Sequence, residues 1–454
     1  MRKYDVIVIG AGDVGLGIVF RAASGGRKVA LIDKGNPGGT CINNGCVPSK
    51  TLIYTADRIT EIREASRFGI RAVIDAIDFG EVMGRMRRAV ENGRNAIASA
   101  LEETEGLDFL KGQCHFLDSH TLYLGGEKIR GRKIFIASGA RPLIPDIQGL
   151  EETGYLTNET VLDLEKRPES LIIIGGGFVG LEYAHFFSAL GTKVTLVQRG
   201  ATLLPSEDPE ISGLLKAGIT GKVELLLGWH PREARRGGTG CALELKDTAG
   251  DAVREISAEK LMIAAGRRSN ADLLRVEEAG IETDSRGFVR VNDFLQTNIR
   301  HIWAAGDATG RAMFTHAGDR AAELAWHNAL RRKKIAMDFE SVPHAVYTFP
   351  QVASVGLTEE AARKKHDILV GRARYSDIVM GEAMMEEEGL AKAVVEKDTG
   401  RILGFHIIGP HASILIQEVV NVIGKKGGLE EITGRMHIFP ALSNIVTEVL
   451  GNIG

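Results

Sequence analysis

One segment of the chain occurs twice, and this duplication constrains the fold more than any other feature. Residues 6–35 align with residues 171–200 at a constant offset of 165, and each copy contains a G-x-G-x-x-G pattern. A short apolar run precedes the glycines in each copy, and an amphipathic stretch, another glycine and a second apolar run follow them. This order predicts a strand, a tight turn, a helix and a second strand, which together form the dinucleotide-binding βαβ unit.

The three glycines of each copy have separate roles in such a unit. The first permits the tight turn, the second lets the backbone approach a pyrophosphate, and the third allows helix and strand to pack closely. The N-terminus of the helix then faces the phosphates. We therefore expect two bound dinucleotides, one at Gly10, Gly12 and Gly15 and the other at Gly175, Gly177 and Gly180.

The two copies differ at the residue that would contact the ribose. Asp33 and Gln198 each lie 23 residues after the first glycine of their copy. The carboxylate of Asp33 can accept hydrogen bonds from a ribose diol, which suits FAD. Gln198 has no carboxylate, and Arg199 adds a cation that could bind a 2′-phosphate, so this copy suits NADPH at least as well as NADH. Arg199 could also be an ordinary solvated charge.

Composition restricts the class of protein. The chain has 454 residues, 44% of them hydrophobic and 25% charged, which is typical of a globular protein with two to four domains. Charge is nearly balanced, with a net value of −3, so binding to nucleic acid is not expected. No apolar run is long enough to span a membrane. Four cysteines are too few for a secreted disulfide framework, which favours a cytoplasmic setting.

Two further segments look like crossover strands between domains. Residues 141–142 and 267–268 each follow an apolar run, at 134–137 and 261–265, through a glycine. A third run at 301–305 precedes a helical stretch from about residue 315. From residue 351 onward, strand-like runs at 390–395 and 403–408 precede helical ones, with no nucleotide motif. The basic run 331–334 is interpreted as a solvated helix end.

Two cysteines lie close together just after the first copy. Cys41 and Cys46 are five residues apart in the segment GGTCINNGCVPSK, residues 38–50. On a regular helix this spacing gives a rise of about 7.5 Å, beyond the Cα separation of roughly 6.8 Å that a disulfide tolerates. A bond between them therefore needs a distorted turn, which the intervening Asn-Asn-Gly permits. Near a helix start and Lys50, the thiolates should be stabilised. The other two cysteines, Cys114 and Cys241, are expected in the core.

With these motifs the chain resembles the flavoprotein disulfide oxidoreductases, in the branch that contains dihydrolipoyl dehydrogenase and mercuric reductase. The resemblance covers essentially all 454 residues. It implies an α/β fold with two Rossmann-like dinucleotide-binding domains, for FAD and NAD(P), and a C-terminal α+β dimerisation domain. The implied bounds are 1–152 and 271–338 for the FAD-binding domain, 153–270 for the NAD(P)-binding domain and 339–454 for the dimerisation domain.

The resemblance also implies roles for individual residues, and no metal site. Cys46 would be the thiolate nearest the flavin, and Cys41 the thiol that exchanges with substrate. Lys50 and Glu182 resemble the ion pair beside the flavin, although Glu182 could be an ordinary acid in the first turn of its helix. The implied FAD-binding residues are Gly10, Gly12, Gly15, Asp33, Lys34, Thr40, Lys50, Cys114, Gly139, Asp307 and Thr315. The implied NAD(P)H-binding residues are Gly175, Gly177, Gly180, Glu182, Gln198, Arg199 and Gly266.

The C-terminal stretch departs from the family pattern. Dihydrolipoyl dehydrogenases carry H-x-H-P-T-L-x-E there, contributed across the dimer to the thiols, whereas residues 437–444 read HIFPALSN. The base is replaced by Phe439 and its orienting glutamate by Asn444. A positioned base is worth about 10² to 10⁴ in rate, so efficient oxidation of dihydrolipoamide is in doubt unless His437 substitutes. The tyrosine and C-terminal thiol pair of mercuric reductases are also missing: Ala441 follows the proline, and the last cysteine is Cys241.

These features predict a cytoplasmic, homodimeric, FAD-dependent NAD(P)H:disulfide oxidoreductase with the organisation of dihydrolipoyl dehydrogenase. Electrons would pass between NAD(P)H, FAD, the Cys41–Cys46 disulfide and a small-molecule or protein-bound dithiol or disulfide, a lipoyl group included. Two alternatives stay open. One is NADPH-dependent metal reduction resembling that of mercuric reductase. The other is a non-catalytic flavoprotein subunit, which the presence of Cys41, Cys46, Lys50 and Glu182 disfavours.

Overall fold

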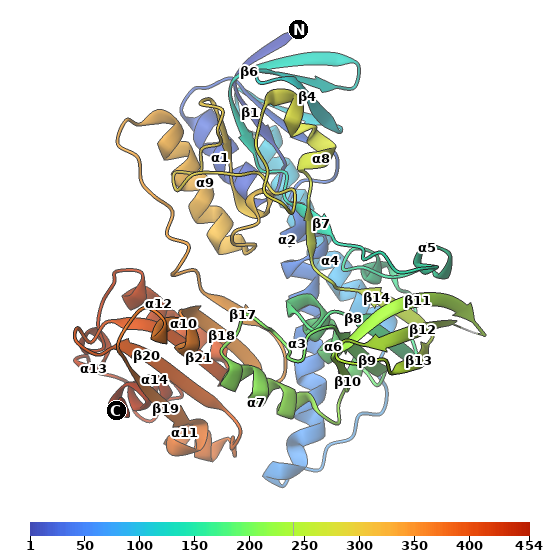
Figure 1. Ribbon diagram of the computed structural model, residues 1–454, viewed down its shortest axis with the longest axis vertical. Helices are drawn as coiled ribbons and strands as arrows, with labels where there is room; N and C mark the ends of the chain where they lie inside the picture. The colour runs from blue at the N-terminus through green and yellow to red at the C-terminus, as the bar shows by residue number, and fades with distance from the viewer. Residues whose placement is uncertain (239) are drawn as a thin grey trace. The chain divides into compact units, whose positions relative to one another are not determined.

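The computed structural model describes residues 1–238 and 240–454, which divide into two compact units (Figure 1). The first unit consists of Met1–Thr51, Gly80–Leu143 and Gly266–Phe339. The second consists of Leu52–Phe79, Ile144–Ala265 and Glu340–Gly454. Each unit contains one copy of the duplicated segment. The finer division into three domains, with the bounds expected above, stays a prediction.

A parallel sheet lies at the centre of the first unit. Its strand order is β3-β2-β1-β6, and β16 pairs with β6 as well. The residues of β1 from Val6 to Ile9 are at most 4% exposed, as expected for a strand covered on both faces. Helices α1 (Asp13–Ser24) and α9 (Thr315–Leu330) pack against each other. The strands are β1 (Arg2–Ile9), β2 (Val29–Asp33), β3 (Leu107–Lys111), β6 (Glu127–Ile136) and β16 (Ile302–Ala304).

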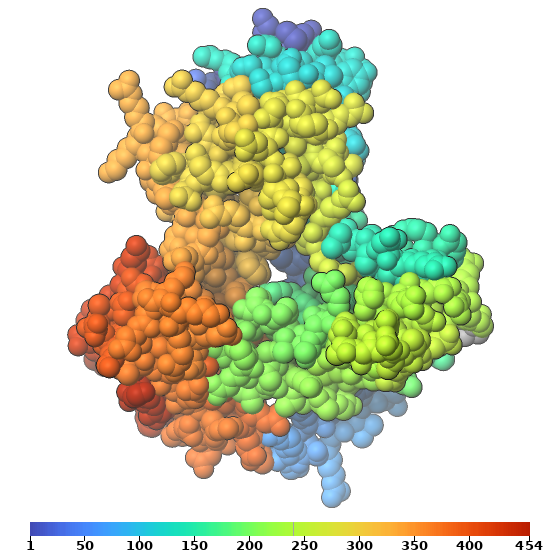
Figure 2. Space-filling view, viewed as in Figure 1, coloured from blue at the N-terminus to red at the C-terminus, as the bar shows by residue number. Residues whose placement is uncertain are grey.

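An antiparallel ribbon extends this sheet. It consists of β4 (Cys114–Asp118), β5 (Thr121–Leu124) and the first half of β6. In the space-filling view this ribbon is cyan, and the yellow segment that follows β15 covers the surface next to it (Figure 2). Strands β7 (Ala140–Pro142) and β15 (Arg267–Ser269) pair antiparallel where the chain leaves and re-enters the first unit. The two crossover strands expected from the sequence are therefore confirmed.

The second unit repeats the strand–helix–strand arrangement of the first. Its parallel sheet has the order β10-β9-β8-β14, and a three-stranded antiparallel sheet has the order β11-β12-β13. The parallel strands are β8 (Ser170–Ile174), β9 (Lys193–Gln198), β10 (Glu224–Leu227) and β14 (Lys260–Ile263). The antiparallel strands are β11 (Trp229–Gly237), β12 (Gly240–Asp247) and β13 (Val253–Ala258). Helix α6 (Phe178–Ala189) joins β8 to β9, and α7 (Pro209–Ile219) precedes β10.

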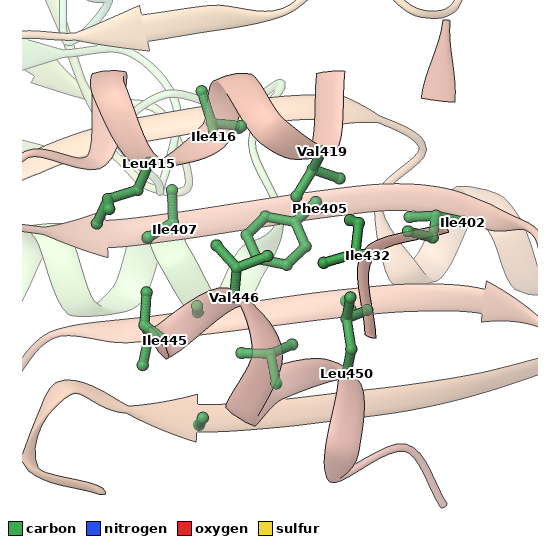
Figure 3. Packing of buried hydrophobic residues seen from close by; sticks show 14 of the residues in the cluster. Ile402, Phe405, Ile407, Leu415, Ile416, Val419, Ile432, Ile445, Val446 and Leu450 are labelled. Carbon is green, nitrogen blue, oxygen red and sulfur yellow. The ribbon is translucent and has the colours of Figure 1, made fainter. Parts of the chain in front are cut away.

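The last part of the second unit is an antiparallel sheet covered by helices. Its order is β17-β18-β21-β20-β19. Figure 3 shows Phe405 of β21 packed between Val419 of α12 and Val446 of α14, so both helices contribute to one core. The strands are β17 (His344–Val346), β18 (Gln351–Gly356), β19 (Ile368–Arg374), β20 (Leu390–Glu396) and β21 (Ile402–Gly409). The covering helices are α12 (Ala412–Ile423) and α14 (Asn444–Gly451).

Helices complete both units. The segment after the first copy forms α2 (Gly39–Asn44), α3 (Cys46–Glu64) and α4 (Phe79–Glu102). Short helices are α5 (Leu150–Thr153), α8 (Ala271–Leu274), α10 (Glu359–Arg363), α11 (Val379–Ala383) and α13 (Glu430–Thr433). Among the described residues, no helix is both long and apolar enough to cross a membrane.

Candidate active site

The two glycine-rich turns have the same backbone geometry. Gly10 and Gly175 have φ values of +109° and +120°, which only glycine adopts without strain. A Cβ on Gly15 would lie 1.8 Å from Gly10 O, and one on Gly180 would lie 1.9 Å from Gly175 O. The first and third glycines therefore have the turn and packing roles expected of them. The middle glycine of the second copy, Gly177, has open space in front of it.

In both copies, the side chain at the end of the second strand accepts a hydrogen bond from the backbone of the glycine-rich turn. Ala11 N donates to Asp33 Oδ2 at 2.6 Å. At the equivalent position of the second copy, Gly176 N donates to Gln198 Oε1 at 3.0 Å. The duplication thus extends to individual hydrogen bonds. The difference is chemical, because one turn ends at a carboxylate and the other at a neutral amide.

A pocket in the first unit fits the nucleotide end of FAD. Gly10, Asp33, Lys34 and Cys114, all expected to bind FAD, lie together in its wall. The hydroxyl oxygen of Ser138 is buried there without a hydrogen-bond partner among the described residues, so it is free to bond to a ligand. Cys114 is 2% exposed, as expected for a core thiol. The remaining lining residues carry no motif that the sequence alone reveals: Ile9, Ile32, Gly112, Gln113, Ser138, Asn270, Leu273 and Leu274.

Arg267 lies near Thr40 and Asp307, two other residues expected to bind FAD. Its Nη2 donates to Ala140 O at 2.6 Å and lies 3.5 Å from Thr40 Oγ1. Its charge also acts on Asp307, where it opposes the rise in pKa that burial causes. The sequence analysis assigned Arg267 to a crossover strand and gave it no role. Gly139 has a φ of +65° and follows β6. The roles of Thr40, Gly139 and Asp307 as FAD ligands stay predictions.

The distorted turn expected between the two thiols is present. Helix α2 ends at Asn44, and α3 begins at Cys46, with Gly45 between them. Both cysteines are free thiols in the structure. Cys46 Sγ lies 3.6 Å from Thr315 Oγ1. Thr315 begins α9, so the N-terminus of that helix faces the thiols.

The pKa values of the two thiols are shifted in opposite directions. The hydrogen bond from Cys41 lowers the pKa of Cys46 to about 6, and Thr315 and Lys50 act in the same direction. The same hydrogen bond, together with burial, raises the pKa of Cys41. The expectation of stabilised thiolates was therefore right for Cys46 and wrong for Cys41. The reason is that a hydrogen bond to a thiolate stabilises only the member of the pair that has lost its proton.

We expect acidification to remove this thiolate. As the pH falls through about 6, Cys46 should become protonated, and thiolate-to-flavin charge-transfer absorbance of the two-electron-reduced holoenzyme should fade. Above that pH the absorbance should be constant. A pH titration under anaerobic conditions measures this directly. Fading that instead sets in near the ordinary pKa of a cysteine would show that the hydrogen bond from Cys41 does not stabilise the Cys46 thiolate.

The residues expected at the nicotinamide site belong to the second unit, except Gly266, which begins the last segment of the first unit. Arg199 follows β9, is exposed, and makes no salt bridge among the described residues. Gly266, expected in the same site, has a φ of +125°. Glu182 is 6% exposed in α6, and its Oε1 accepts a hydrogen bond of 3.2 Å from Tyr347 N. The ion pair of Lys50 with Glu182 stays a prediction.

The C-terminal stretch offers no free base at the family position. Phe439 is 73% exposed, next to the cis bond to Pro440. Asn444 bridges the turn before α14, accepting from Ala441 N at 2.8 Å and donating to Ile438 O at 3.1 Å. Its side chain therefore organises the local backbone.

Both ring nitrogens of His437 also make hydrogen bonds within the chain. Its Nε2 lies 2.9 Å from Glu418 Oε1 and its Nδ1 lies 3.0 Å from Arg435 O. Both partners are hydrogen-bond acceptors, so both bonds form together only when the ring carries both protons. These contacts favour a structural role over replacement of the missing base.

The chain is similar to several characterised proteins along its whole length. The family described as pyridine nucleotide-disulphide oxidoreductase matches residues 4–331, and the dimerisation domain of that family matches residues 342–450. Mycothione reductase of Mycobacterium tuberculosis is 35% identical, over 99% of each chain. Mercuric reductase of Staphylococcus aureus is 31% identical over 95% of this chain and 79% of its own. Dihydrolipoyl dehydrogenase 3 of Haloarcula marismortui is 31% identical over 99% and 96%.

A solved structure agrees with the fold. The HOCl-induced flavoprotein disulfide reductase RclA from Escherichia coli superimposes with a TM-score of 0.88 at 29% identity, covering 99% of both chains. The α/β fold with a dimerisation domain, expected from the sequence, is therefore confirmed.

Proposed function

The chain belongs to the pyridine nucleotide-disulphide oxidoreductase family, and from this premise we propose that it reduces a small disulfide with electrons from NADPH. The family uses FAD and NAD(P)H, as the sequence predicted. Bound FAD carries two electrons between the nicotinamide and the disulfide. The dimerisation domain supports a homodimer. We propose the ligand residues named above for both cofactors, because the glycine turns and the pocket in the first unit have the geometry such ligands need.

The protonation of Cys41 and Cys46 favours reduction of a disulfide over oxidation of a dithiol. In the dithiol state Cys46 holds the thiolate and Cys41 the proton, so the second step of disulfide reduction, attack of Cys46 on a mixed disulfide at Cys41, needs no base. Oxidation of a dithiol substrate requires deprotonation of the substrate instead, and the position of the family base is Phe439. This difference is the observation that carries the proposal.

The names of two relatives support a low-molecular-weight substrate. Mycothione reductase and the HOCl-induced flavoprotein disulfide reductase are both disulfide reductases by name. We propose a soluble low-molecular-weight disulfide of this kind rather than a lipoyl group on a carrier protein. Residues 242–454 contain no cysteine, and Cys241 is buried and donates to Ala258 O, so this part of the chain supplies no thiol pair for metal transfer. We also propose a reducing, cytoplasmic setting, because four cysteines are too few for a secreted disulfide framework in a chain of 454 residues.

An acceptor panel tests the proposal. The purified FAD-loaded protein is first titrated anaerobically with NADH and with NADPH. It is then supplied with mycothiol disulfide, glutathione disulfide, bis(hydroxyethyl) disulfide, lipoamide and Hg²⁺. We expect turnover with NADPH and at least one of the small disulfides, and slow oxidation of dihydrolipoamide. Turnover with Hg²⁺ and none of the disulfides would overturn the proposal.

Arg199→Glu should shift the protein from NADPH toward NADH. The change removes a cation that can bind the 2′-phosphate and adds a carboxylate that can bind the ribose diol. We expect the ratio of kcat/KM for NADPH over NADH to fall by about 10²-fold, the size of one lost charge-assisted contact plus a new like-charge repulsion. Steady-state kinetics with both nucleotides measure this ratio.

Lys193→Glu is the matched control. Lys193 is exposed at the opposite end of β9, so it undergoes the same change of charge away from the nucleotide. The control should leave the ratio unchanged. An unchanged ratio in Arg199→Glu itself would make Arg199 an ordinary surface charge.

A further inference from the structure

A histidine of the C-terminal sheet reaches the nucleotide-binding part of the second unit. His344 begins β17, and its Nε2 is hydrogen-bonded to Glu207 Oε1. Its ring also makes a T-shaped contact with the ring of Phe178, with the centroids 5.6 Å apart and the planes at 71°. All three residues belong to the second unit. His344 therefore connects the C-terminal sheet to the segment that carries the second glycine-rich turn.

Phe178 is part of the turn that is expected to bind the nicotinamide nucleotide. It follows Gly177 directly and is the first residue of α6. The N-terminus of such a helix directs its backbone N–H groups at a pyrophosphate. The side chain of Phe178 is half-buried, so the position of this part of the turn depends on what packs against the ring. His344 supplies one such contact.

Glu207 holds the imidazole of His344 in place. Its side chain is fully buried, and its Oε2 accepts a hydrogen bond of 2.5 Å from Ser354 Oγ. Burial raises the pKa of Glu207, but the hydrogen bonds with His344 and Ser354 outweigh this effect and hold that pKa below its ordinary value. A buried carboxylate that keeps its charge needs such partners, because a buried charge without them is costly. Displacement of the imidazole would leave Glu207 with one partner fewer.

Cross-strand pairing anchors this pair in the sheet. His344 lies opposite Ser354 in the pairing of β17 with β18, and Ser354 lies opposite His406 in the pairing of β18 with β21. His406 Nδ1 lies 3.0 Å from Ser354 Oγ, and its Nε2 lies 3.1 Å from Leu357 O. Both Ser354 and His406 are buried. A row of polar side chains across three strands therefore fixes the positions of Glu207 and His344.

We propose that His344 is a positioning residue for the nicotinamide nucleotide, holding Phe178 and with it the second glycine-rich turn in the conformation that binds the pyrophosphate. Glu207 acts through His344 in this role. The inference rests on the proposed function, because it assumes that NADPH or NADH binds at this turn. It makes nucleotide affinity depend in part on a residue of the C-terminal sheet, outside both copies of the duplicated segment.

Reduction of the flavin by the nucleotide tests this role. His344→Gln keeps a hydrogen-bond donor for Glu207 and removes the ring that packs on Phe178. The FAD-loaded, oxidised protein is mixed anaerobically with increasing NADPH, and in parallel with NADH, in a stopped-flow spectrometer. We expect the concentration that gives half the limiting rate of flavin reduction to rise about 2- to 10-fold, the equivalent of one aromatic pair. The limiting rate should change little, because the turn binds the phosphates and not the nicotinamide ring.

Two further measurements separate positioning from a general loss of structure. Calorimetric titration of the oxidised protein with NADP⁺ and with NAD⁺ should show binding that is weaker by the same factor in His344→Gln. The protein is also reduced with dithiothreitol, freed of reductant and oxidised with bis(hydroxyethyl) disulfide, a step that needs no nucleotide. His344→Gln should keep the wild-type rate of this step and the wild-type FAD content, whereas a folding defect would lower both.

A double variant tests whether the ring is the part of His344 that matters. His344→Phe together with Glu207→Gln keeps an aromatic ring against Phe178 and leaves no buried charge unpaired. The amide oxygen of the glutamine can still accept the hydrogen bond from Ser354. Because the aromatic contact is kept, we expect this variant to bind NADP⁺ with an affinity within about 2-fold of the wild type.

His366→Gln is the matched control. His366 Nδ1 lies 2.8 Å from Glu396 Oε1, and its side chain is 24% exposed against 20% for His344. This pair lies beside β19, the strand farthest from β17 in the order of the sheet. Removal of its imidazole takes away a similar histidine–glutamate pair, and it should leave nucleotide affinity unchanged.

The outcomes distinguish the two proposals. If neither NADPH nor NADH reduces the flavin of the wild-type protein, the proposed function fails. If one of them does, and His344→Gln leaves nucleotide affinity unchanged or slows oxidation by the disulfide to the same extent, the role of His344 fails while the proposed function stands.

Discussion

Cys46→Ser should remove both disulfide turnover and the thiolate-to-flavin charge-transfer absorbance of the two-electron-reduced protein. The absorbance depends on the thiolate, and Cys46 is the thiol whose pKa is lowered. Cys41→Ser should likewise reduce turnover to background but show the absorbance before any reductant is added, because its Cys46 has no disulfide partner and lies beside an oxidised flavin. Anaerobic reduction followed by spectroscopy, with parallel assays on small disulfides, measures both properties.

A third serine variant is the control for this pair. Cys241 is buried in the second unit, where its thiol donates to Ala258 O at 3.4 Å. A serine hydroxyl can make the same hydrogen bond, so Cys241→Ser should keep both turnover and absorbance. If Cys46→Ser keeps the absorbance, the flavin-side thiol has been assigned to the wrong cysteine.

Rebuilding the family dyad should raise dihydrolipoamide oxidation by about 10² to 10⁴, the usual contribution of a positioned base. The double variant Phe439→His with Asn444→Glu restores a base and the carboxylate that orients it. The gain should exceed the sum of the single changes, because the two residues act as one unit. Assays with dihydrolipoamide and NAD(P)⁺, normalised to FAD-loaded dimer, measure it.

The structure makes these substitutions feasible in the single chain. Phe439 is 73% exposed, so no core of its own chain depends on the ring. Asn444 lies in the first turn of α14, where a glutamate is favoured by the helix dipole. The cost is loss of the bond from Asn444 Nδ2 to Ile438 O. Asn444→Glu alone is therefore the control for local stability.

The unmodified protein should oxidise dihydrolipoamide slowly, with a rate that climbs with pH as the substrate itself loses protons. His437→Ala should change this rate little, since both ring nitrogens of His437 already face acceptors. The unmodified protein could instead oxidise dihydrolipoamide fast, and His437→Ala could leave that rate unchanged. This result would contradict the claim that a missing base limits dihydrolipoamide oxidation.

The sequence by itself determined the features that depend on short-range spacing. The offset of 165 residues predicted two βαβ units, and the structure repeats even the hydrogen bond from the turn to the strand end in both copies. The five-residue spacing of Cys41 and Cys46 predicted a break in the helix, which occurs at Gly45. Such features are readable because turn geometry, helix rise and strand length are fixed by residues that are neighbours in the chain.

Only the tertiary structure decided which distant groups meet at the thiols. Gly39, two residues before Cys41, packs on Gly12, where a Cβ on Gly39 would lie 2.5 Å from Gly12 Cα. Thr315 Oγ1, at the start of α9, lies 3.6 Å from Cys46 Sγ, although 269 residues separate the two in the sequence. Arg267 approaches Thr40 in the same way. The unequal sharing of the proton between the thiols follows from these contacts, because a pKa depends on charges and donors within a few ångströms, whatever their distance along the chain.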